Sequence, residues 1–380
     1  MKDLSESRIL IVDDVKANVD VLVEALRGHY KLSVALDGAS ALRSLERNPP
    51  DLMLLDIMMP PGIDGYEVCR QIRASEATRE IPVMFLSALE DVKDKTRGFE
   101  AGGNDYLTKP FEILEVKARV QALLKAKAYA DAVKEAMARD LRIAREIQMG
   151  ILPADLAAAT RGTGLDVQAV IEPAKKVGGD LYEVLRADDD RVVVAVGDVS
   201  GKGIPAALFM AVAVTVLRTL ARSITDPAEI LKRLNDELAA QNPRGMFVTI
   251  QCLVFDVAEK RVTAAGAGHH QLVILSPGQA PRLAFPSSGR PAGLMPLNPI
   301  SSESMALAPG DTFVLFSDGV SEATNAADEF FGEDRLLAML DALDPRAPAD
   351  IVRETLNAVR DFAGAAPQSD DITILAARYL

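Results

Sequence analysis

The strongest constraint on the fold comes from the first third of the chain, where short apolar stretches alternate with segments of helical spacing. Four of these stretches read as strands that end in polar residues: Arg8–Asp14, Leu52–Asp56, Pro82–Ser87 and Asp105–Lys109. Short apolar strands between amphipathic helices predict a parallel, doubly wound α/β sheet. In such a sheet the carboxyl ends of the strands share one edge, and the ligand site forms there.

Five side chains with related chemistry are expected to meet at this edge. Asp13 and Asp14 can hold a Mg2+ ion, and the Asp56 carboxylate can act as a nucleophile toward a phosphoryl donor. Lys109 and Ser87 can bind the phosphoryl oxygens. Any one of these residues could be an ordinary turn or helix cap, but all five at strand ends of one domain favour a phosphoryl-transfer site.

Residues 8–121 closely resemble the receiver domain of two-component response regulators. The motifs that carry the resemblance are IVDD (Ile11–Asp14), LMLLDIMMP (Leu52–Pro60), DGYEVC (Asp64–Cys69), FLSA (Phe85–Ala88) and YLTKPF (Tyr106–Phe111). One departure is the segment Pro60–Gly62, which makes the loop before Asp64 one residue longer than usual.

The resemblance assigns roles to individual residues. It implies that Asp56 is the phosphoacceptor for a sensor histidine kinase, and that Ser87 and Tyr106 form the switch pair beside the phosphate-sensing Lys109. It also implies a receiver Mg2+, for which it names these ligands: Asp13, Asp14, Asp56 and the carbonyl group of Met58.

Residues 112–150 predict a long helix, because they lack proline and have no glycine before Gly150. Apolar residues recur mostly three or four positions apart: Val116, Val120, Leu123, Ala130, Val133, Met137, Leu141, Ala144 and Ile147. This stripe suits a helical seam, which we interpret as a parallel homodimer contact with a possible short coiled coil. The alternative is one amphipathic helix packed on its own domain. Lys127 and Lys134 interrupt the best heptad frame.

The remaining chain predicts a β-sandwich flanked by helices, an α+β fold. Seven stretches have the composition of strands: Leu165–Ile171, Arg191–Gly197, Phe247–Asp256, Arg261–Ala267, Gln271–Leu275, Thr312–Ser317 and Ile372–Tyr379. Four have the composition of helices: Ile204–Arg222, Pro227–Ala240, Glu333–Leu343 and Pro348–Phe362. We therefore divide the chain into a receiver domain at 1–124, a helical linker at 125–153 and an output domain at 154–380.

Acidic turns follow or precede several of these strands. Asp180 follows a Gly-Gly pair, Asp198 opens a glycine-rich turn, Asp318 follows an apolar run, and Asp370 lies beside Asp371. Taken alone, each is an ordinary turn. Together they could hold two Mg2+ or Mn2+ ions, which can clamp an in-line displacement at phosphorus. An all-carboxylate set disfavours Zn2+.

The two adjacent histidines of the output domain, His269 and His270, lack a third partner in the sequence. We interpret them as structural residues or as a minor element of the site, and not as metal ligands.

The output domain resembles the SpoIIE/RsbU-type branch of the metal-dependent (type 2C) protein serine/threonine phosphatases. The motifs are IQMGILP (Ile147–Pro153), KVGGDLYE (Lys176–Glu183), GDVSGKGIPAAL (Gly197–Leu208), FVTI (Phe247–Ile250), AGAGHH (Ala265–His270), PGDTFVLFSDGVSEATN (Pro309–Asn325) and SDDITIL (Ser369–Leu375). Leu181 and Glu183 depart from the usual GGDFYD pattern without replacing the acid.

This resemblance implies two Mn2+ or Mg2+ ions. Asp198 would bridge them, with the carbonyl group of Val199 as a further ligand. Asp318 and Asp370 would bind one ion, Asp371 being a less certain member of that pair, and Asp180 would assist the other.

Two functions compete. The first is a phosphatase switched by phosphorylation of Asp56, with a phosphorylated STAS-type anti-sigma-factor antagonist as the substrate that the resemblance implies. The second is a non-catalytic adaptor, because some receiver proteins carry a phosphatase-like fold without metal acids. The four acids Asp180, Asp198, Asp318 and Asp370 are all present, which favours the enzyme.

Composition removes further classes. The net charge of -13 argues against nucleic-acid and anionic-membrane partners. Two cysteines are too few for a disulfide framework. The N-terminus lacks a signal-peptide pattern, and the longest uncharged run, Gly203–Leu217, is too short to span a bilayer. We therefore expect a cytoplasmic protein.

Overall fold

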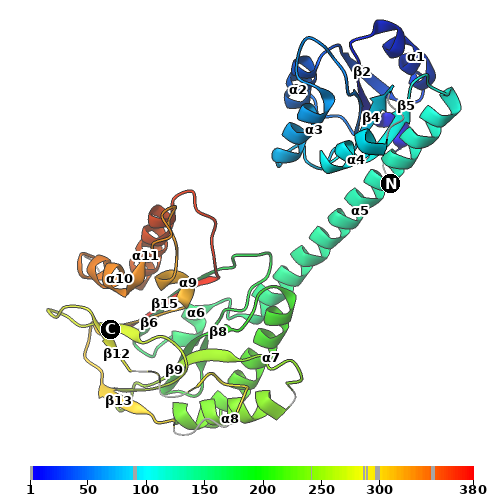
Figure 1. Ribbon diagram of the computed structural model, residues 1–380. Helices are drawn as coiled ribbons and strands as arrows, with labels where there is room; N and C mark the ends of the chain where they lie inside the picture. Colours follow the sequence, from blue (N-terminus) through cyan, green and yellow to red (C-terminus); the bar gives the residue numbers. More distant parts are fainter. Residues whose placement is uncertain are drawn as a thin grey trace. The chain divides into compact units, whose positions relative to one another are not determined.

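The computed structural model describes residues 3–88, 92–240, 242–285, 287, 290–295, 300–343 and 347–380, with the side chains of residues 92–95 not included. The chain divides into two compact units, Met1–Arg139 and Asp140–Leu380. Figure 1 labels the elements of both.

The first unit contains a parallel sheet in the order β2-β1-β3-β4-β5. Its strands are β1 (Arg8–Val12), β2 (Lys31–Ala35), β3 (Leu52–Asp56), β4 (Val83–Ser87) and β5 (Asp105–Thr108). The predicted doubly wound sheet is confirmed. The edge strand β2 was not singled out from the sequence, because only its last residue is buried and it lacks the apolar run of the central strands.

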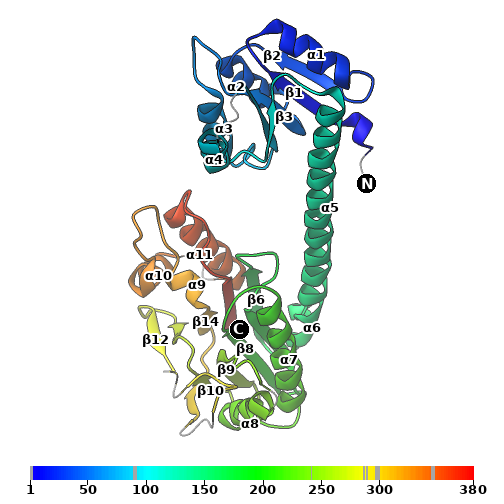
Figure 2. The ribbon, with the colours of Figure 1, turned by 45° about the vertical axis from the view of Figure 1, so that its right-hand side comes forward.

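Helices cover both faces of this sheet, since alternate strand residues point to opposite sides. Ile9 and Ile11 of β1 pack with α1 (Lys16–Leu26) and with the start of α5 (Ile113–Ile151). Leu10 and Val12 face the opposite side. That side is covered by α2 (Gly38–Arg47), α3 (Gly65–Ala74) and α4 (Val92–Glu100) (Figure 2). A short 3₁₀ helix, Leu4–Glu6, precedes β1.

The predicted long helix is present as α5, which has 39 residues. Its first turns pack on the receiver core through Val116, Val120 and Leu124. The first part of the apolar stripe therefore stabilises its own domain, as in the alternative interpretation. Beyond Leu124, five large apolar side chains of α5 are exposed: Tyr129, Val133, Met137, Ile143 and Ile147.

The second unit contains two antiparallel sheets. The first has the order β13-β10-β9-β8-β7, and the second has the order β12-β11-β14-β15-β6. The strands of the first sheet are β7 (Leu181–Arg186), β8 (Arg191–Val199), β9 (Val248–Asp256), β10 (Arg261–Ala267) and β13 (Glu303–Ala306). Those of the second are β6 (Leu165–Glu172), β11 (Leu272–Leu275), β12 (Arg282–Ala284), β14 (Thr312–Phe316) and β15 (Ile372–Tyr379).

The two sheets pack face to face, and helices cover their outer faces. Phe255 and Phe313 meet edge to face between the sheets, with ring centroids 5.3 Å apart. One outer face carries α7 (Ile204–Ala221) and α8 (Pro227–Ala240). The other carries α10 (Gly332–Asp341) and α11 (Pro348–Ala363) (Figure 2). The predicted β-sandwich flanked by helices is confirmed, with α6 (Leu156–Thr160) and α9 (Asp318–Ser321) as short additions.

Within the described residues, α7 is long and apolar enough to cross a membrane by length and composition. In this fold it packs beside α8 and against β7 and β8. Its buried residues are Ala206, Met210, Ala213, Val214, Leu217 and Ala221. The apolar character of α7 therefore has a packing role in the sandwich.

Candidate functional site

In the receiver unit, one lysine lies between two buried carboxylates. The Nζ atom of Lys109 is 2.7 Å from Asp13 Oδ2 and 2.9 Å from Asp56 Oδ2. Asp13 and Asp56 are almost fully buried. Asp14 lies partly exposed beside them, and the three acids offer oxygen atoms within 4.8 Å of one another. The structure therefore brings these four predicted residues together at the carboxyl edge of the sheet.

Electrostatics at this edge favour a bound cation. Burial, together with the charge of Asp13, raises the pKa of Asp56, although Lys109 acts in the opposite direction. One ammonium group thus faces two buried carboxylates and a third acid. The oxygen-only donor set fits Mg2+, which binds through one or two carboxylates and keeps water ligands.

The proposed switch residues Ser87 and Tyr106 are both buried, at the end of β4 and within β5. The Tyr106 ring lies 5.3 Å from that of Phe85 and 5.5 Å from that of Phe99. Its hydroxyl packs so closely on α4 that a Cβ atom at Gly98 would lie 1.4 Å away. The Met58 side chain is exposed, and the role of its carbonyl group stays a prediction.

In the second unit, Asp180 lies in the turn before β7 and is almost fully buried. The hydroxyl of Thr373 donates a hydrogen bond of 2.6 Å to Asp180 Oδ2. Asp180 Oδ1 is buried and has no hydrogen-bond partner among the described residues. Burial and the neighbouring charge of Asp198 raise the pKa of Asp180 well above its usual value. A buried carboxylate oxygen without a hydrogen-bond partner is suited to binding a cation.

Asp198 lies inside β8, which extends two residues beyond the predicted end at Gly197. It pairs with Thr249 of β9 in the sheet register. Burial, followed by the charges of Asp318, Asp370 and Asp371, raises the pKa of Asp198 to about 7. The predicted acids from distant segments therefore influence one another at this strand end.

Asp318 and Asp370 come from the ends of two neighbouring strands, β14 and β15. Asp318 begins α9, and its Oδ1 atom is buried without a hydrogen-bond partner in the described part of the chain. Burial and the charge of Asp370 raise the pKa of Asp318. Lys202 Nζ contacts Asp370 Oδ2 at 2.8 Å. The ammonium group of Lys202 thus occupies one oxygen of a predicted metal ligand.

Asp371 differs from the other acids because both of its oxygens accept backbone hydrogen bonds. The N–H of Ala174 donates to Oδ1 at 2.8 Å, and the N–H of Gly179 donates to Oδ2 at 2.6 Å. A Cβ atom at Gly179 would lie 2.6 Å from the carbonyl oxygen of Val199, so only glycine fits this contact. Asp371 therefore holds the turn before Asp180, and its metal ligation stays a prediction.

The donor set of this centre fits hard divalent cations. Four carboxylates are supplied by turns and strand ends that are far apart in sequence: Asp180, Asp198, Asp318 and Asp370. Two of their oxygen atoms are buried without a hydrogen-bond partner among the described residues. Neighbouring carboxylates raise one another's pKa, and a bound divalent ion neutralises this repulsion. Carboxylate oxygens are suitable ligands for Mg2+ and Mn2+.

The His269 side chain links two strands, β9 and β14. Its Nε2–H donates to the carbonyl oxygen of Phe316 at 3.1 Å, which leaves Nδ1 to accept from the Thr249 hydroxyl at 2.9 Å. Burial lowers the pKa of His269 to about 3. Both ring nitrogens are engaged, consistent with a structural residue. His270 differs: it lies with Asp318 and Glu322 in a group whose donor atoms are within 4.8 Å of one another. The sequence analysis did not single out Glu322.

The sequence analysis also missed two contacts between the end of α5 and the rest of the second unit. The side-chain amide of Gln148 donates to the carbonyl oxygen of Gly178 at 2.7 Å, and the N–H of Gly178 donates back at 3.3 Å. Arg218 of α7 donates to the carbonyl oxygen of Ile151 at 2.8 Å and pairs with the buried Glu183 at 2.6 Å. A polar residue within the otherwise apolar motif IQMGILP was the available signal for Gln148.

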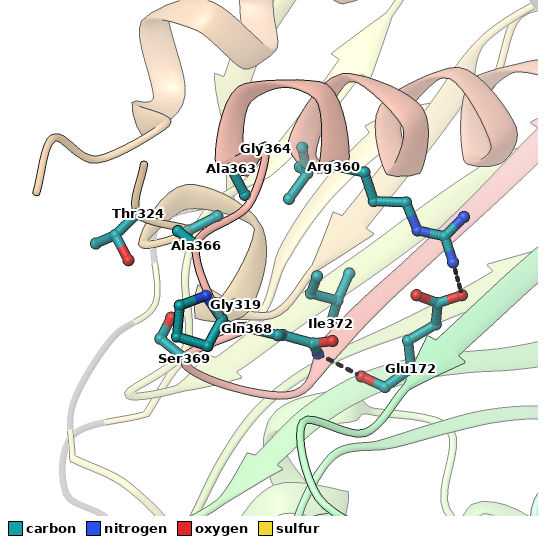
Figure 3. Close-up of a pocket in the computed structure, with 13 residues that line it drawn as sticks. Glu172, Gly319, Thr324, Arg360, Ala363, Gly364, Ala366, Gln368, Ser369 and Ile372 are labelled. Atoms are coloured by element: carbon teal, nitrogen blue, oxygen red, sulfur yellow. Dashed lines mark hydrogen bonds and ion pairs between the residues drawn. The ribbon is translucent and has the colours of Figure 1, made fainter. Parts of the chain in front are cut away.

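A pocket of about 140 Å³ lies beside the Asp370 loop, between α9, α11 and the start of β15. Figure 3 shows Gln368 at its floor and the ion pair between Arg360 and Glu172 at its side. Gln368 donates to the carbonyl oxygens of Glu172 at 2.9 Å and Asp370 at 2.7 Å. These contacts hold the loop that presents the Asp370 carboxylate.

Comparisons with known proteins agree with these two folds. A profile of the response regulator receiver domain matches residues 9–121. The chain is 36% identical over 201 residues to the response regulator PleD of Caulobacter vibrioides, a match that covers 50% of this chain and 42% of PleD. The chain thus spans less than half of the length of this curated relative.

Among solved structures, the SiaA-PP2C domain of Pseudomonas aeruginosa is 26% identical with a TM-score of 0.59, covering 66% of this chain and 99% of that domain. The RsbU and RsbW domains of Rv1364c from Mycobacterium tuberculosis are 24% identical with a TM-score of 0.51, and the match covers 57% of this chain and 60% of that one. At this identity the similarity supports the fold only. The profile of Stage II sporulation protein E (SpoIIE) matches residues 188–380, just over half of the chain. The chain therefore belongs to the SpoIIE family of type 2C phosphatase-like proteins and carries a response regulator receiver domain before it.

Proposed function

We propose that the protein is a metal-dependent protein serine/threonine phosphatase controlled by phosphorylation of Asp56. The observation that carries this proposal is the meeting of Asp180, Asp198 and Asp318 with Asp370, where burial and mutual charge raise the pKa values of the first three. An adaptor would not need buried carboxylates that destabilise one another. A cation-binding centre does need them.

Each acid has a proposed task in hydrolysis. Asp198, together with the carbonyl group of Val199, would hold both cations. Asp318 and Asp370 would bind one of these cations, and Asp180 would assist in binding the other. A bound pair of Mn2+ or Mg2+ ions would supply Lewis acidity toward the phosphoryl group and activate a water molecule. Asp371 positions the Asp180 turn through Gly179.

Control would reach this centre through α5. The start of α5 packs on the receiver sheet through Val116 and Val120, and its end holds Gly178, two residues from Asp180. A change in the receiver that displaces α5 would therefore move the turn that carries an active-site acid. Two discrete arrangements of one helix are sufficient for such coupling.

The partners follow from the two domains. A receiver domain implies phosphorylation by a histidine kinase, and a phosphatase domain implies a phosphoprotein substrate. We propose a phosphorylated STAS-type anti-sigma-factor antagonist as that substrate, within a cytoplasmic partner-switching pathway. We further propose that the exposed apolar side chains of α5 after Leu124 form a homodimer contact.

The test is hydrolysis of p-nitrophenyl phosphate by the full chain, with and without Mn2+, before and after beryllofluoride treatment. Beryllofluoride mimics a phosphoryl group on Asp56. Metal-dependent turnover that changes with beryllofluoride would support the proposal and give the direction of control. Absence of turnover under every condition would overturn the enzyme assignment and favour the adaptor.

A further inference from the structure

The pocket between α9, α11 and the start of β15 lies directly against two of the proposed metal ligands. Gly319 and Ser369 line it, and they are the chain neighbours of Asp318 and Asp370. Neighbouring Cα atoms are about 3.8 Å apart, and an extended chain advances about 3.5 Å per residue. A phosphorylated residue bound at these acids would therefore have the residues beside it within reach of the pocket.

Apolar side chains supply most of the surface of this pocket. Six of its lining residues are apolar: Ala323, Val359, Ala363, Ala366, Pro367 and Ile372. Its volume of about 140 Å³ is close to that of an apolar protein cavity of about 150 Å³ that binds one benzene molecule. The pocket therefore has room for one aliphatic or aromatic side chain, but not for a longer segment of peptide.

The charged and amide groups in the pocket wall already have partners. The guanidinium group of Arg360 pairs with the Glu172 carboxylate, and the amide of Gln368 donates to the carbonyl oxygens of Glu172 and Asp370 (Figure 3). A charged side chain that entered the pocket would lose water without gaining a counter-charge, which costs free energy. Removal of an apolar side chain from water is favourable. The wall thus favours an apolar occupant.

Packing and hydrogen bonds fix the walls of the pocket. A Cβ atom at Gly319 would lie 1.9 Å from the carbonyl oxygen of Asp371, so no gap separates α9 from the start of β15. Lys202 Nζ donates to the carbonyl oxygen of Ser369 at 2.7 Å. Ser369 and the two residues before it are exposed, so the pocket opens to solvent there. A pocket formed in advance binds a side chain without the entropic cost of ordering its walls.

We propose that this pocket is a substrate-recognition subsite, which takes one aliphatic or aromatic side chain of the phosphoprotein from within about three residues of the phosphorylated serine or threonine. The inference rests on the proposed function, because it places the phosphorylated residue at the neighbouring acids. Burial of the side chain contributes to the binding of a protein substrate and not to that of a small phosphate ester. The pocket would thus let the enzyme distinguish phosphoproteins by the sequence around the phosphorylated residue.

Seven-residue phosphoserine peptides test the subsite in the full chain. The reference peptide has alanine at every position beside the phosphoserine, and each test peptide has leucine at one of them. With Mn2+, before and after beryllofluoride treatment, we expect leucine at one position to raise kcat/KM by about tenfold or more. Peptides with a non-hydrolysable phosphonomethyl group should show the same preference in their Kd values. Equal values for alanine and leucine at every position would overturn the proposal.

Two variants fill the pocket without removing a buried group. Ala363→Leu at the end of α11 and Ala366→Leu in the following loop each place a larger side chain in the space. We expect the preference for leucine over alanine to fall to within about twofold in both variants. Ala349→Leu, at an exposed position near the start of α11, is the control that should keep the preference. A preference that persists in both filled variants would contradict the subsite.

Hydrolysis of p-nitrophenyl phosphate separates this inference from the proposed function, because this ester has no side chain for the pocket. Turnover of the ester by a chain that shows no leucine preference would contradict the subsite alone. Leucine-dependent binding of the phosphonomethyl peptides by a chain that hydrolyses no phosphate ester would contradict the phosphatase assignment alone.

Discussion

Gln148, in the last turns of α5, forms two hydrogen bonds with the backbone of Gly178, one from its amide to the carbonyl oxygen and one from the N–H to its Oε1. The Gln148 side chain is buried, so water cannot replace these bonds easily. Gly178 precedes Gly179 and Asp180, which face Val199 and the acid centre. This contact joins α5, the helix that leaves the receiver, to the turn that carries Asp180, a proposed metal ligand.

Replacing Gln148 by alanine tests this connection. Gln148→Ala leaves the Gly178 N–H and carbonyl group buried without partners, which costs roughly 1–3 kcal/mol and frees the turn. We expect kcat to fall on the order of tenfold, together with loss of the response to beryllofluoride. The matched control is Glu146→Ala, an exposed position on the same helix. Unchanged kcat and an unchanged response would show that control enters elsewhere.

Among the receiver acids, Asp56 alone should accept the phosphoryl group. Asp56→Asn removes the nucleophilic carboxylate, so incubation with a small phosphodonor should give no phosphorylated band on a phosphate-affinity gel. Hydrolysis by the phosphatase unit should then no longer respond to the donor. Asp20→Asn, an exposed acid on α1, is the control that should still accept the phosphoryl group. Incorporation of phosphate into Asp56→Asn would contradict the assignment.

The stability of the metal-free protein should depend on pH through Asp198. Its pKa of about 7 in the folded chain lies above the ordinary value of 3.8, so the folded state binds more protons than the unfolded state between these values. The free energy of unfolding therefore falls as pH rises from about 4 to 7, by on the order of 4 kcal/mol.

The measurement is urea unfolding of the metal-free chain between pH 4 and pH 8. The transition to follow is the one whose midpoint shifts when Mn2+ is added. Asp198→Asn removes the titrating group, so its stability should depend less on pH than that of the unchanged chain. Added Mn2+ should restore stability to the unchanged chain at pH 8 but not to the variant. If the free energy of unfolding depends equally on pH in both proteins, Asp198 is not the source of the effect.

Lys202 should compete with metal for Asp370. Its Nζ atom is 2.8 Å from Asp370 Oδ2, and this contact must open before that oxygen can bind a cation. Lys202→Met should therefore lower the Mn2+ concentration needed for half-saturation by several-fold, as measured by calorimetric titration. Lys202→Arg retains the positive charge and should keep the original affinity within about twofold. Weaker metal binding in Lys202→Met would contradict competition.

The exposed apolar stripe of α5 should mediate dimerisation. Val133 and Met137 are 49% and 61% exposed and lie one helical turn apart. The double variant Val133→Glu with Met137→Glu places two charges in this stripe, so light scattering after size exclusion should report a monomer where the unchanged chain is a dimer. Arg142→Glu, on the opposite side of the helix, should leave the mass unchanged. A monomeric unchanged chain would remove the dimer from the proposal.

The sequence by itself determined both folds and the main acid set. Apolar runs such as Leu52–Asp56 are buried along their whole length, and their composition alone identifies them as central strands. Asp56 and Asp318 follow such runs directly, so their place at a strand end could be read locally. The edge strand β2 and the charged strand β7 escaped detection, because partial exposure and residues such as Glu183 and Arg186 weaken the strand pattern.

Only the tertiary structure decided that Asp371 binds the backbone of a distant turn and that Asp370 pairs with Lys202. Asp370 and Asp371 are adjacent in sequence, yet Asp371 accepts a hydrogen bond from Gly179, 192 residues away, whereas Asp370 faces Lys202. Two other pairs also become neighbours only in the folded chain. His270, which follows β10, lies near Glu322, which follows α9, and Gln148 lies beside Gly178. Such contacts depend on how two sheets and a helix pack on one another. Local sequence patterns specify the helices and strands. They do not show which residues that are distant in sequence become neighbours when these elements pack.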